Sequence, residues 1–150
     1  MKLTENITHY VEASVLCWLA TSSLENVPNV SPKEIFTVYG DDTIIIANVA
    51  SPQTAKNINE NSMVCLSFID VLVQKGYQLK GKAKVVSKHD TEFEVLEKPL
   101  LEITQGQFPF SSIFKITVDT AKPILAPRYV LYPETTEEAQ IKSAKESYGL

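Results

Sequence analysis

The amino-acid sequence predicts a mainly β fold, a small Greek-key barrel of about six strands with short peripheral helices. Residues 43–49, TIIIANV, form a dense β-branched run, which favours a strand over a helix. Residues 76–88, GYQLKGKAKVVSK, alternate polar and apolar side chains, as a half-exposed antiparallel strand does. Helical periodicity occurs only in short stretches between such segments. Hairpins with one helix inserted between strands are typical of small barrels.

The first third of the chain predicts one helix followed by strands. Apolar residues at helical spacing predict a short amphipathic helix over Thr4–Ala13. The bulky apolar run at Val15–Thr21 predicts a strand, and Ser22–Asn26 supplies a turn. Residues 28–39, PNVSPKEIFTVY, carry two prolines, which donate no hydrogen bond to a ladder. We therefore expect an edge strand, or a bulge near Pro32.

The next segment predicts a turn, a strand, a helix and another strand. Gly40–Asp42 form a tight turn before the strand at 43–49. Ser51 and Pro52 are typical of a helix N-cap and first helical position, and good helix formers follow them. The run MVCLSFID at 63–70 predicts a strand.

The long strand at 76–88 is expected to bend at Gly81, and a helix should follow it. Asp90 is the expected cap of a helical stretch at 91–103, TEFEVLEKPLLEI. Pro99 lies inside this stretch, where it removes a hydrogen bond and crowds the preceding turn. We therefore expect Pro99 to kink the helix or divide it into two pieces.

The C-terminal part predicts one more strand, an extended segment and a helix. Residues 111–118, SSIFKITV, have strand character. Pro123, Pro127 and Pro133 are expected to keep the following segment extended. From Thr135 a cap and an acidic first turn open a helix that ends at Gly149.

The composition predicts one globular domain over residues 1–150. Hydrophobic residues make up 44% and charged residues 21% of the 150 residues, an ordinary globular balance. No repeat or low-complexity tract divides the chain. We expect a barrel core at about 15–125 and a C-terminal extended segment and helix at 126–150.

The charge pattern argues against nucleic-acid and membrane partners. The formal net charge is −4, the pI is near 5.2, and the basic residues form no stripe. No segment approaches transmembrane length or resembles a signal peptide, so we expect a cytoplasmic protein. Cys17 and Cys65 each lie within an apolar run and are interpreted as core residues rather than as a disulfide.

Two elements could bind an anion. The helix start at Ser51–Thr54 presents free backbone N–H groups at the positive end of a helix dipole, although most helices have such caps. Strand alternation would place Asn29, Ser31 and Lys33 on one face, although this face could equally be a solvated edge. Because the two elements lie one hairpin apart, we favour a ligand site over either structural explanation.

The sequence resembles a known family at these residues. PNVSPK, then NVASPQTAKNINEN, MVCLSF and GYQLKGKAKVV, are similar to the flavin-binding split barrel of the pyridoxamine 5′-phosphate oxidase-like superfamily and its small flavin mononucleotide (FMN)-binding relatives. The resemblance runs from about Val15 to Val86, and the tail resembles the ending of a short bacterial subgroup. It implies a six-stranded split barrel that forms a homodimer, with FMN bound at the interface by both subunits.

The resemblance also implies which residues hold FMN. The strand is expected to lie along the isoalloxazine ring, and the strand end and helix start are expected to hold the ribityl chain and phosphate. These cofactor-binding residues are Asn29, Val30, Ser31, Pro32, Lys33, Ala47, Asn48, Ser51, Gln53 and Thr54.

Two positions depart from the family pattern. Relatives often carry Lys or Arg where this chain has Gln53, which can donate only a neutral hydrogen bond to a phosphate. We therefore expect weaker FMN binding, or compensation by Lys33, Lys56 or Lys80. True pyridoxamine phosphate oxidases have a tail rich in Arg, His and Trp, whereas this tail has only Arg128. That activity is not expected.

The sequence thus predicts a flavin-dependent oxidoreductase, reduced by nicotinamide or another donor and reoxidised by a small organic acceptor or oxygen. Its catalytic residues are not identifiable, because the flavin supplies the chemistry. The alternatives are a non-catalytic FMN electron carrier, a module that binds haem or a deazaflavin, and a dimeric barrel with an empty site. His9 and His89 lie outside any metal-ligand spacing, so no metal site is predicted.

Overall fold

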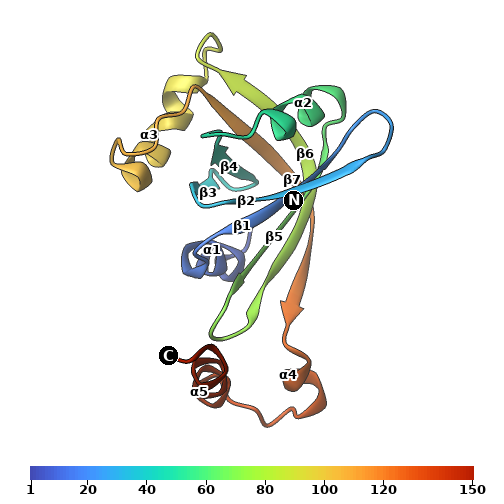
Figure 1. Cartoon of the computed structure of the whole chain (residues 1–150), viewed down its shortest axis with the longest axis vertical. Coiled ribbons are helices and arrows are strands. Elements are labelled where there is room, and N and C mark those ends of the chain that lie inside the picture. Colours follow the sequence, from blue (N-terminus) through green and yellow to red (C-terminus); the bar gives the residue numbers. More distant parts are fainter.

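The computed structural model describes residues 1–150 and contains one antiparallel sheet with helices around it (Figure 1). The strands are β1 (Cys17–Ser22), β2 (Pro28–Lys33), β3 (Phe36–Tyr39), β4 (Thr43–Ala47), β5 (Met63–Asp70), β6 (Lys75–Ser87) and β7 (Ser112–Leu125). The helices are α1 (Glu5–Ala13), α2 (Pro52–Glu60), α3 (Phe93–Thr104), α4 (Pro127–Leu131) and α5 (Glu137–Tyr148).

The sheet curls into a half-barrel, consistent with a split barrel. Its strand order is β2-β1-β5-β6-β7-β4-β3, so β2 and β3 are the two edges. Only Glu34 and Ile35 separate these edge strands in the chain. The sheet must therefore curl until its edges approach. At this junction the Ala47 N–H donates to the Ile35 carbonyl at 2.9 Å, which extends the β3–β4 ladder by one position.

The structure has seven strands, so the prediction of six was wrong. The segment 28–39 forms two strands, of which β2 pairs with β1 and β3 pairs with β4. The expectation of an edge strand is confirmed, because Pro32 lies on β2, an edge strand of the sheet. A proline has no N–H to donate and is tolerated at such an edge. After Lys33 the chain passes from one edge of the sheet to the other, and one continuous strand could not belong to both edges.

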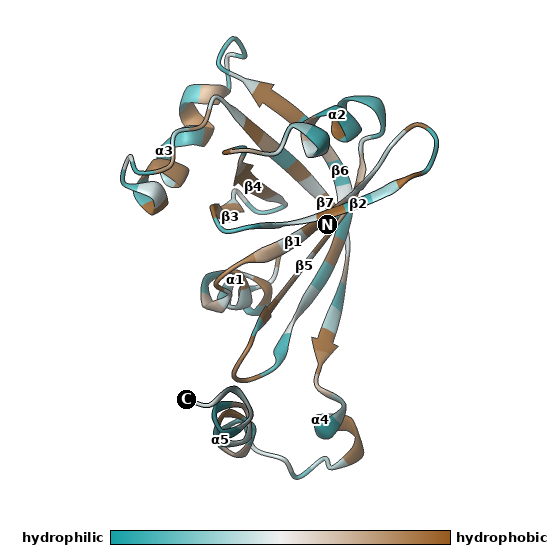
Figure 2. Cartoon of the chain, in the orientation of Figure 1, coloured by the Kyte–Doolittle hydropathy of each residue, from teal (hydrophilic) through white to brown (hydrophobic).

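The core is divided between the two faces of β4. Ile44 and Ile46 face the barrel interior, whereas Ile45 and Ala47 face α3. All five residues of β4 are buried, which explains why the four residues after Thr43 are all apolar rather than alternating with polar ones. Figure 2 shows this as continuous brown on β4, in contrast to the alternating colours of β6.

The predicted bend at Gly81 corresponds to an irregularity in the long β6–β7 ladder. The register shifts between Lys80 and Gly81. A Cβ atom built on Gly81 would lie 2.1 Å from the Thr117 carbonyl oxygen. Glycine is therefore required there because the neighbouring backbone leaves no room for a side chain.

The structure corrects three local expectations for the second half. The helix α3 begins at Phe93, and the Asp90 carboxylate accepts from the Ser87 N–H at 2.7 Å rather than capping the helix. It also runs through Pro99 as one helix, so of the two expected effects of Pro99 the division into two pieces does not occur. The segment after Pro123 is not extended throughout, because Pro127 opens the short α4; a proline's fixed φ suits the first helical position.

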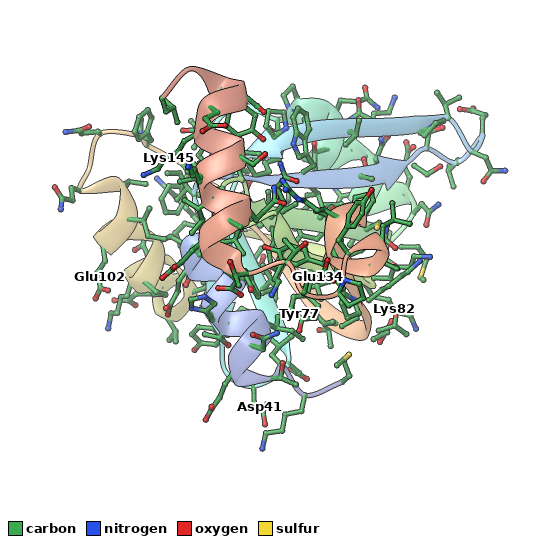
Figure 3. All side chains as sticks on the ribbon, turned by 90° about the horizontal axis from the view of Figure 1, so that it is seen from below. Asp41, Tyr77, Lys82, Glu102, Glu134 and Lys145 are labelled. Carbon is green, nitrogen blue, oxygen red and sulfur yellow. The ribbon has the colours of Figure 1, made fainter.

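The C-terminal helix α5 lies against the lower end of the sheet (Figures 1 and 3). The Lys75 ammonium group lies 2.8 Å from the Glu137 carboxylate and over the ring of Tyr129. The Tyr129 hydroxyl donates to the Val73 carbonyl at 2.7 Å. No helix of the chain has both the length and the apolar character needed to span a membrane.

Candidate functional site

A cavity of about 240 Å³ opens where the β2–β3 junction meets the β4–α2 junction. Its first wall is Pro32 to Ile35, and its second is formed by Ala47 and by Val49 to Ser51. The two walls meet because β2 and β4 lie near the opposed edges of the curled sheet. Phe108, from the loop between α3 and β7, completes the lining.

The polar part of this cavity is centred on the Lys33 side chain. Its Nζ donates to the Ser51 Oγ at 2.9 Å and to the Ser31 Oγ. The Ser31 Oγ lies 3.4 Å from the Thr54 Oγ1, within hydrogen-bonding distance. These four side chains, Lys33, Ser31, Ser51 and Thr54, are called the Lys33 cluster below.

Lys33 is a buried cation without an acidic partner. Its exposed fraction is 5%, and none of the four ion pairs of the chain includes it. Burial lowers the pKa of Lys33, because removal from water penalises the charged form. Buried charges in proteins are normally paired. The cluster therefore has the electrostatic character of an anion site whose counter-charge is supplied by a ligand.

The start of α2 adds unpaired backbone donors beside Lys33. Ser51 occupies the N-cap position, but its hydroxyl makes no capping bond and instead accepts from Lys33. In the first turn only Ala55 donates to the Ser51 carbonyl, so the Gln53 and Thr54 N–H groups have no intrahelical acceptor. Helix N-termini of this kind favour anions.

Asn48 fixes the position of Ser51. Its side-chain oxygen accepts from the Ser51 N–H at 3.0 Å, and its amide nitrogen donates to the Ser112 Oγ at 2.9 Å. The direct contact of Asn48 with FMN stays a prediction, because these bonds join Asn48 only to other residues of the chain. Asn48 links the helix start to the first residue of β7.

Gln53 is connected to the protein interior by a chain of hydrogen bonds. Its Nε2 donates to the Asn57 Oδ1 at 2.8 Å, and the Asn57 Nδ2 donates to the Thr21 Oγ1 at 3.0 Å. Asn57 and Thr21 are almost fully buried, at 1% and 4% exposure. Gln53 itself is exposed, and one of its amide hydrogens is already engaged within the chain.

The structure brings together six of the ten predicted site residues. Pro32, Lys33, Ala47 and Ser51 line the cavity, whereas Ser31 and Thr54 are joined to it only by the hydrogen bonds of the Lys33 cluster. The remaining four do not line it: Asn29, Val30, Asn48 and Gln53. Alternation along β2 is as predicted, since Asn29, Ser31 and Lys33 are the less exposed residues of that strand.

Sequence reasoning missed part of the lining. Val49 and Ala50 are small apolar residues in the β4–α2 connection, and Ile35 lies in the two-residue link between the edge strands. Phe108 comes from a loop far along the chain. Only the pairing of β4 with β7 brings that loop beside Ser51, so no local pattern could have identified it.

The two cysteines offer no reactive thiolate. Burial raises the pKa of Cys17 to about 12, and its Sγ lies 3.5 Å from the Lys33 carbonyl oxygen. Burial also raises the pKa of Cys65, which is half-buried. Both thiols are free, and the chain has no cluster of His, Cys, Asp and Glu suited to a metal ion.

Comparisons with known proteins agree with this architecture. The family model described as pyridoxamine 5′-phosphate oxidase matches residues 3–137. No curated protein sequence matches the chain.

Three similar solved structures share the fold. HupZ of Group A Streptococcus is 22% identical with a TM-score of 0.67, over 79% of this chain and 91% of that one. An FMN-binding protein from Syntrophomonas wolfei is 19% identical with a TM-score of 0.67, over 79% and 84%. The haem storage protein HutZ from Vibrio cholerae is 18% identical with a TM-score of 0.62, over 83% and 96%. At these identities the likeness shows the fold alone.

Proposed function

Since the chain belongs to the pyridoxamine 5′-phosphate oxidase family, we propose that it binds FMN and acts as a flavin-dependent oxidoreductase. The observation that carries this proposal is the buried Lys33, which has no acidic partner and lies beside the start of α2. A ligand phosphate would be the missing counter-charge of this ammonium group, and it would accept hydrogen bonds from the free N–H groups of the helix start.

The Lys33 cluster fits a phosphorylated, flat ligand better than a free inorganic anion. Its hydroxyl groups, Ser31, Ser51 and Thr54, can donate to phosphate or ribityl oxygens. Ala47, Val49 and Ala50 provide small apolar contacts beside them. Such a mixture of a few polar groups and an apolar lining is typical of cofactor sites.

In the proposed activity, bound FMN would supply the hydride and electron chemistry. Lys33 and the α2 start would bind the anionic part, and the apolar wall would exclude water from the ring. A nicotinamide or another small electron donor would reduce the cofactor, and a small organic acceptor or oxygen would reoxidise it. We do not propose pyridoxamine phosphate oxidase activity itself, because the C-terminal segment offers only Arg128 for a second phosphate.

We also propose that the working unit is a homodimer with FMN at the interface. The cavity of about 240 Å³ is below the roughly 300–1,000 Å³ usual for small-molecule sites, which supports a site completed by a second chain. The outer face of the sheet is apolar beside it. A hollow of about 520 Å³ on that face is lined by Trp18, and seven of its eight lining residues are hydrophobic. Pro32 pairs with Trp18 in the ladder and also lines the cavity.

The cofactor proposal is tested by the visible spectrum of purified protein and by titration of stripped protein with FMN. We expect oxidised-flavin absorption bands, or saturable quenching of flavin fluorescence near one FMN per chain. Turnover with reduced nicotinamide would distinguish the oxidoreductase from an FMN electron carrier. A colourless protein with no response to FMN would overturn the proposal.

The main alternative is a haem- or deazaflavin-binding module. Its support is the similarity to the haem storage protein HutZ. The cavity lining contains no histidine or cysteine, whereas haem iron needs an axial ligand. A Soret band after haem titration, with no response to FMN, would favour this alternative. If FMN, haem and a deazaflavin all fail to bind, the protein is interpreted as a barrel with an empty site.

We expect Gln53→Lys to raise FMN affinity about tenfold. The new ammonium group at the α2 start can form charge-assisted bonds to phosphate, which are roughly twice as strong as the neutral bond of the amide. The lost bond to Asn57 leaves Asn57 still bound to Thr21. Asn59→Lys, which adds the same charge at an exposed position farther along α2, is the control. Equal FMN dissociation constants for Gln53→Lys and the wild type would refute the expectation.

A further inference from the structure

Phe108 lines the side of the cavity that is formed neither by the β2–β3 junction nor by the β4–α2 junction. It is the one aromatic residue in the lining, and it faces the same space as Lys33 and Ser51. Its side chain is 47% exposed, although aromatic residues usually bury most of their surface. A large apolar side chain left at a cavity mouth suggests that something else covers it.

The loop that carries Phe108 is held at its α3 end. Gln105 and Gly106 both have positive φ values, 49° and 78°, so the chain turns sharply out of α3. The Gln107 N–H donates to the carbonyl of Thr104 at 3.0 Å, and the Gly106 N–H donates to its Oγ1 at 3.3 Å. Thr104 is buried, at 3% exposure, so these two hydrogen bonds attach the loop to the protein interior.

The loop is also held at its β7 end. The ring of Phe110 lies 6.5 Å from that of Phe93 in the core beside α3. Ser112 is bonded through backbone and side chain to Asn48, which in turn orients Ser51. The position of Phe108 is therefore coupled to the same contacts that build the anion site.

We propose that Phe108 is a ligand-contacting residue that selects a flat aromatic ring, with the ring stacked on Phe108 while its anionic group lies at Lys33. This inference rests on the proposed function and deepens it, because the resemblance and the sequence pattern assign no role to Phe108. An aromatic face stacks on a planar ring and gains more than the burial of its area. A small inorganic anion would contact Lys33 without reaching this residue.

The test is FMN titration of the stripped wild type, Phe108→Ala, Phe108→Leu and Val95→Ala. Val95 is an exposed apolar residue on α3 that does not line the cavity, so it controls for the loss of an exposed apolar side chain. We expect Phe108→Ala to weaken FMN binding about tenfold, a ratio equivalent to about 1.4 kcal/mol. Phe108→Leu keeps apolar area but not the aromatic face, so its affinity should be intermediate, and Val95→Ala should match the wild type.

Competition by inorganic phosphate gives a second readout. Phosphate should displace FMN through the Lys33 cluster, and its own inhibition constant should be the same in the wild type and Phe108→Ala. Thermal melting checks that each variant is folded. Equal FMN affinity of wild type and Phe108→Ala overturns the role of Phe108 and leaves the proposed function intact. A wild type that takes up no FMN overturns the proposed function itself.

Discussion

Replacing Lys33 with methionine is expected to lower FMN affinity by about two orders of magnitude and, in the same protein, to raise the melting temperature of the apoprotein. The affinity falls because the phosphate loses its buried cationic partner; hydrogen bonds to charged groups contribute roughly 1.5–3 kcal/mol each. The apoprotein becomes more stable because a buried ammonium group without a counter-ion is removed and replaced by an apolar side chain of similar length. These opposite signs distinguish a ligand-binding cation from a structural one.

The matched control for this experiment is Lys98→Met. Lys98 is exposed on α3 and belongs to no ion pair, so its replacement removes the same charge without touching the cavity. Calorimetric FMN titrations and thermal melts of both variants provide the comparison. An unchanged FMN affinity of Lys33→Met, or a large loss of apoprotein stability, would show that Lys33 serves the fold rather than the ligand.

The stability of the apoprotein should also depend on pH through Lys33. Burial lowers the pKa of Lys33 in the folded chain, so the unfolded chain binds this proton more tightly. Apoprotein stability is therefore expected to increase with pH between the lowered pKa and the ordinary value for lysine. In Lys33→Met that increase should be absent over the same interval.

Replacing Trp18 with glutamate is expected to dissociate the proposed homodimer and, with it, to reduce FMN binding. Trp18 is 49% exposed beside Val15 and Val71, which are 75% and 48% exposed, on the outer face of the sheet. Aromatic residues at the centre of an apolar face carry much of the energy of an interface. A carboxylate there would have to be buried without a partner on association.

Val95→Glu provides the control for Trp18→Glu. It introduces the same charge at a residue of similar exposure on α3, away from the apolar hollow. Sedimentation velocity gives the mass of each protein, and FMN titration follows the site. A dimeric Trp18→Glu protein would place the interface elsewhere, and a monomeric wild type that binds FMN would contradict the homodimer proposal.

Sequence reasoning succeeded where local pattern and environment agreed. The β-branched run of β4 and the alternation of β6 predicted strands because burial on two faces or one face determines those patterns. It failed at residues 28–39, where the apparent single strand is divided between two sheet edges. No local feature specifies how far a sheet curls, and the curl decides this division.

In the candidate site, too, some features follow from the sequence alone and others only from the tertiary structure. The sequence by itself determined the chemical groups: a lysine and a serine on alternate positions of β2, and a serine before the proline that opens α2. Only the tertiary structure decided that Lys33 donates to Ser51, that Lys33 forms no ion pair, and that Phe108 lines the cavity. The physical reason is that side-chain chemistry is local, whereas burial and charge pairing depend on which distant segments the sheet brings together.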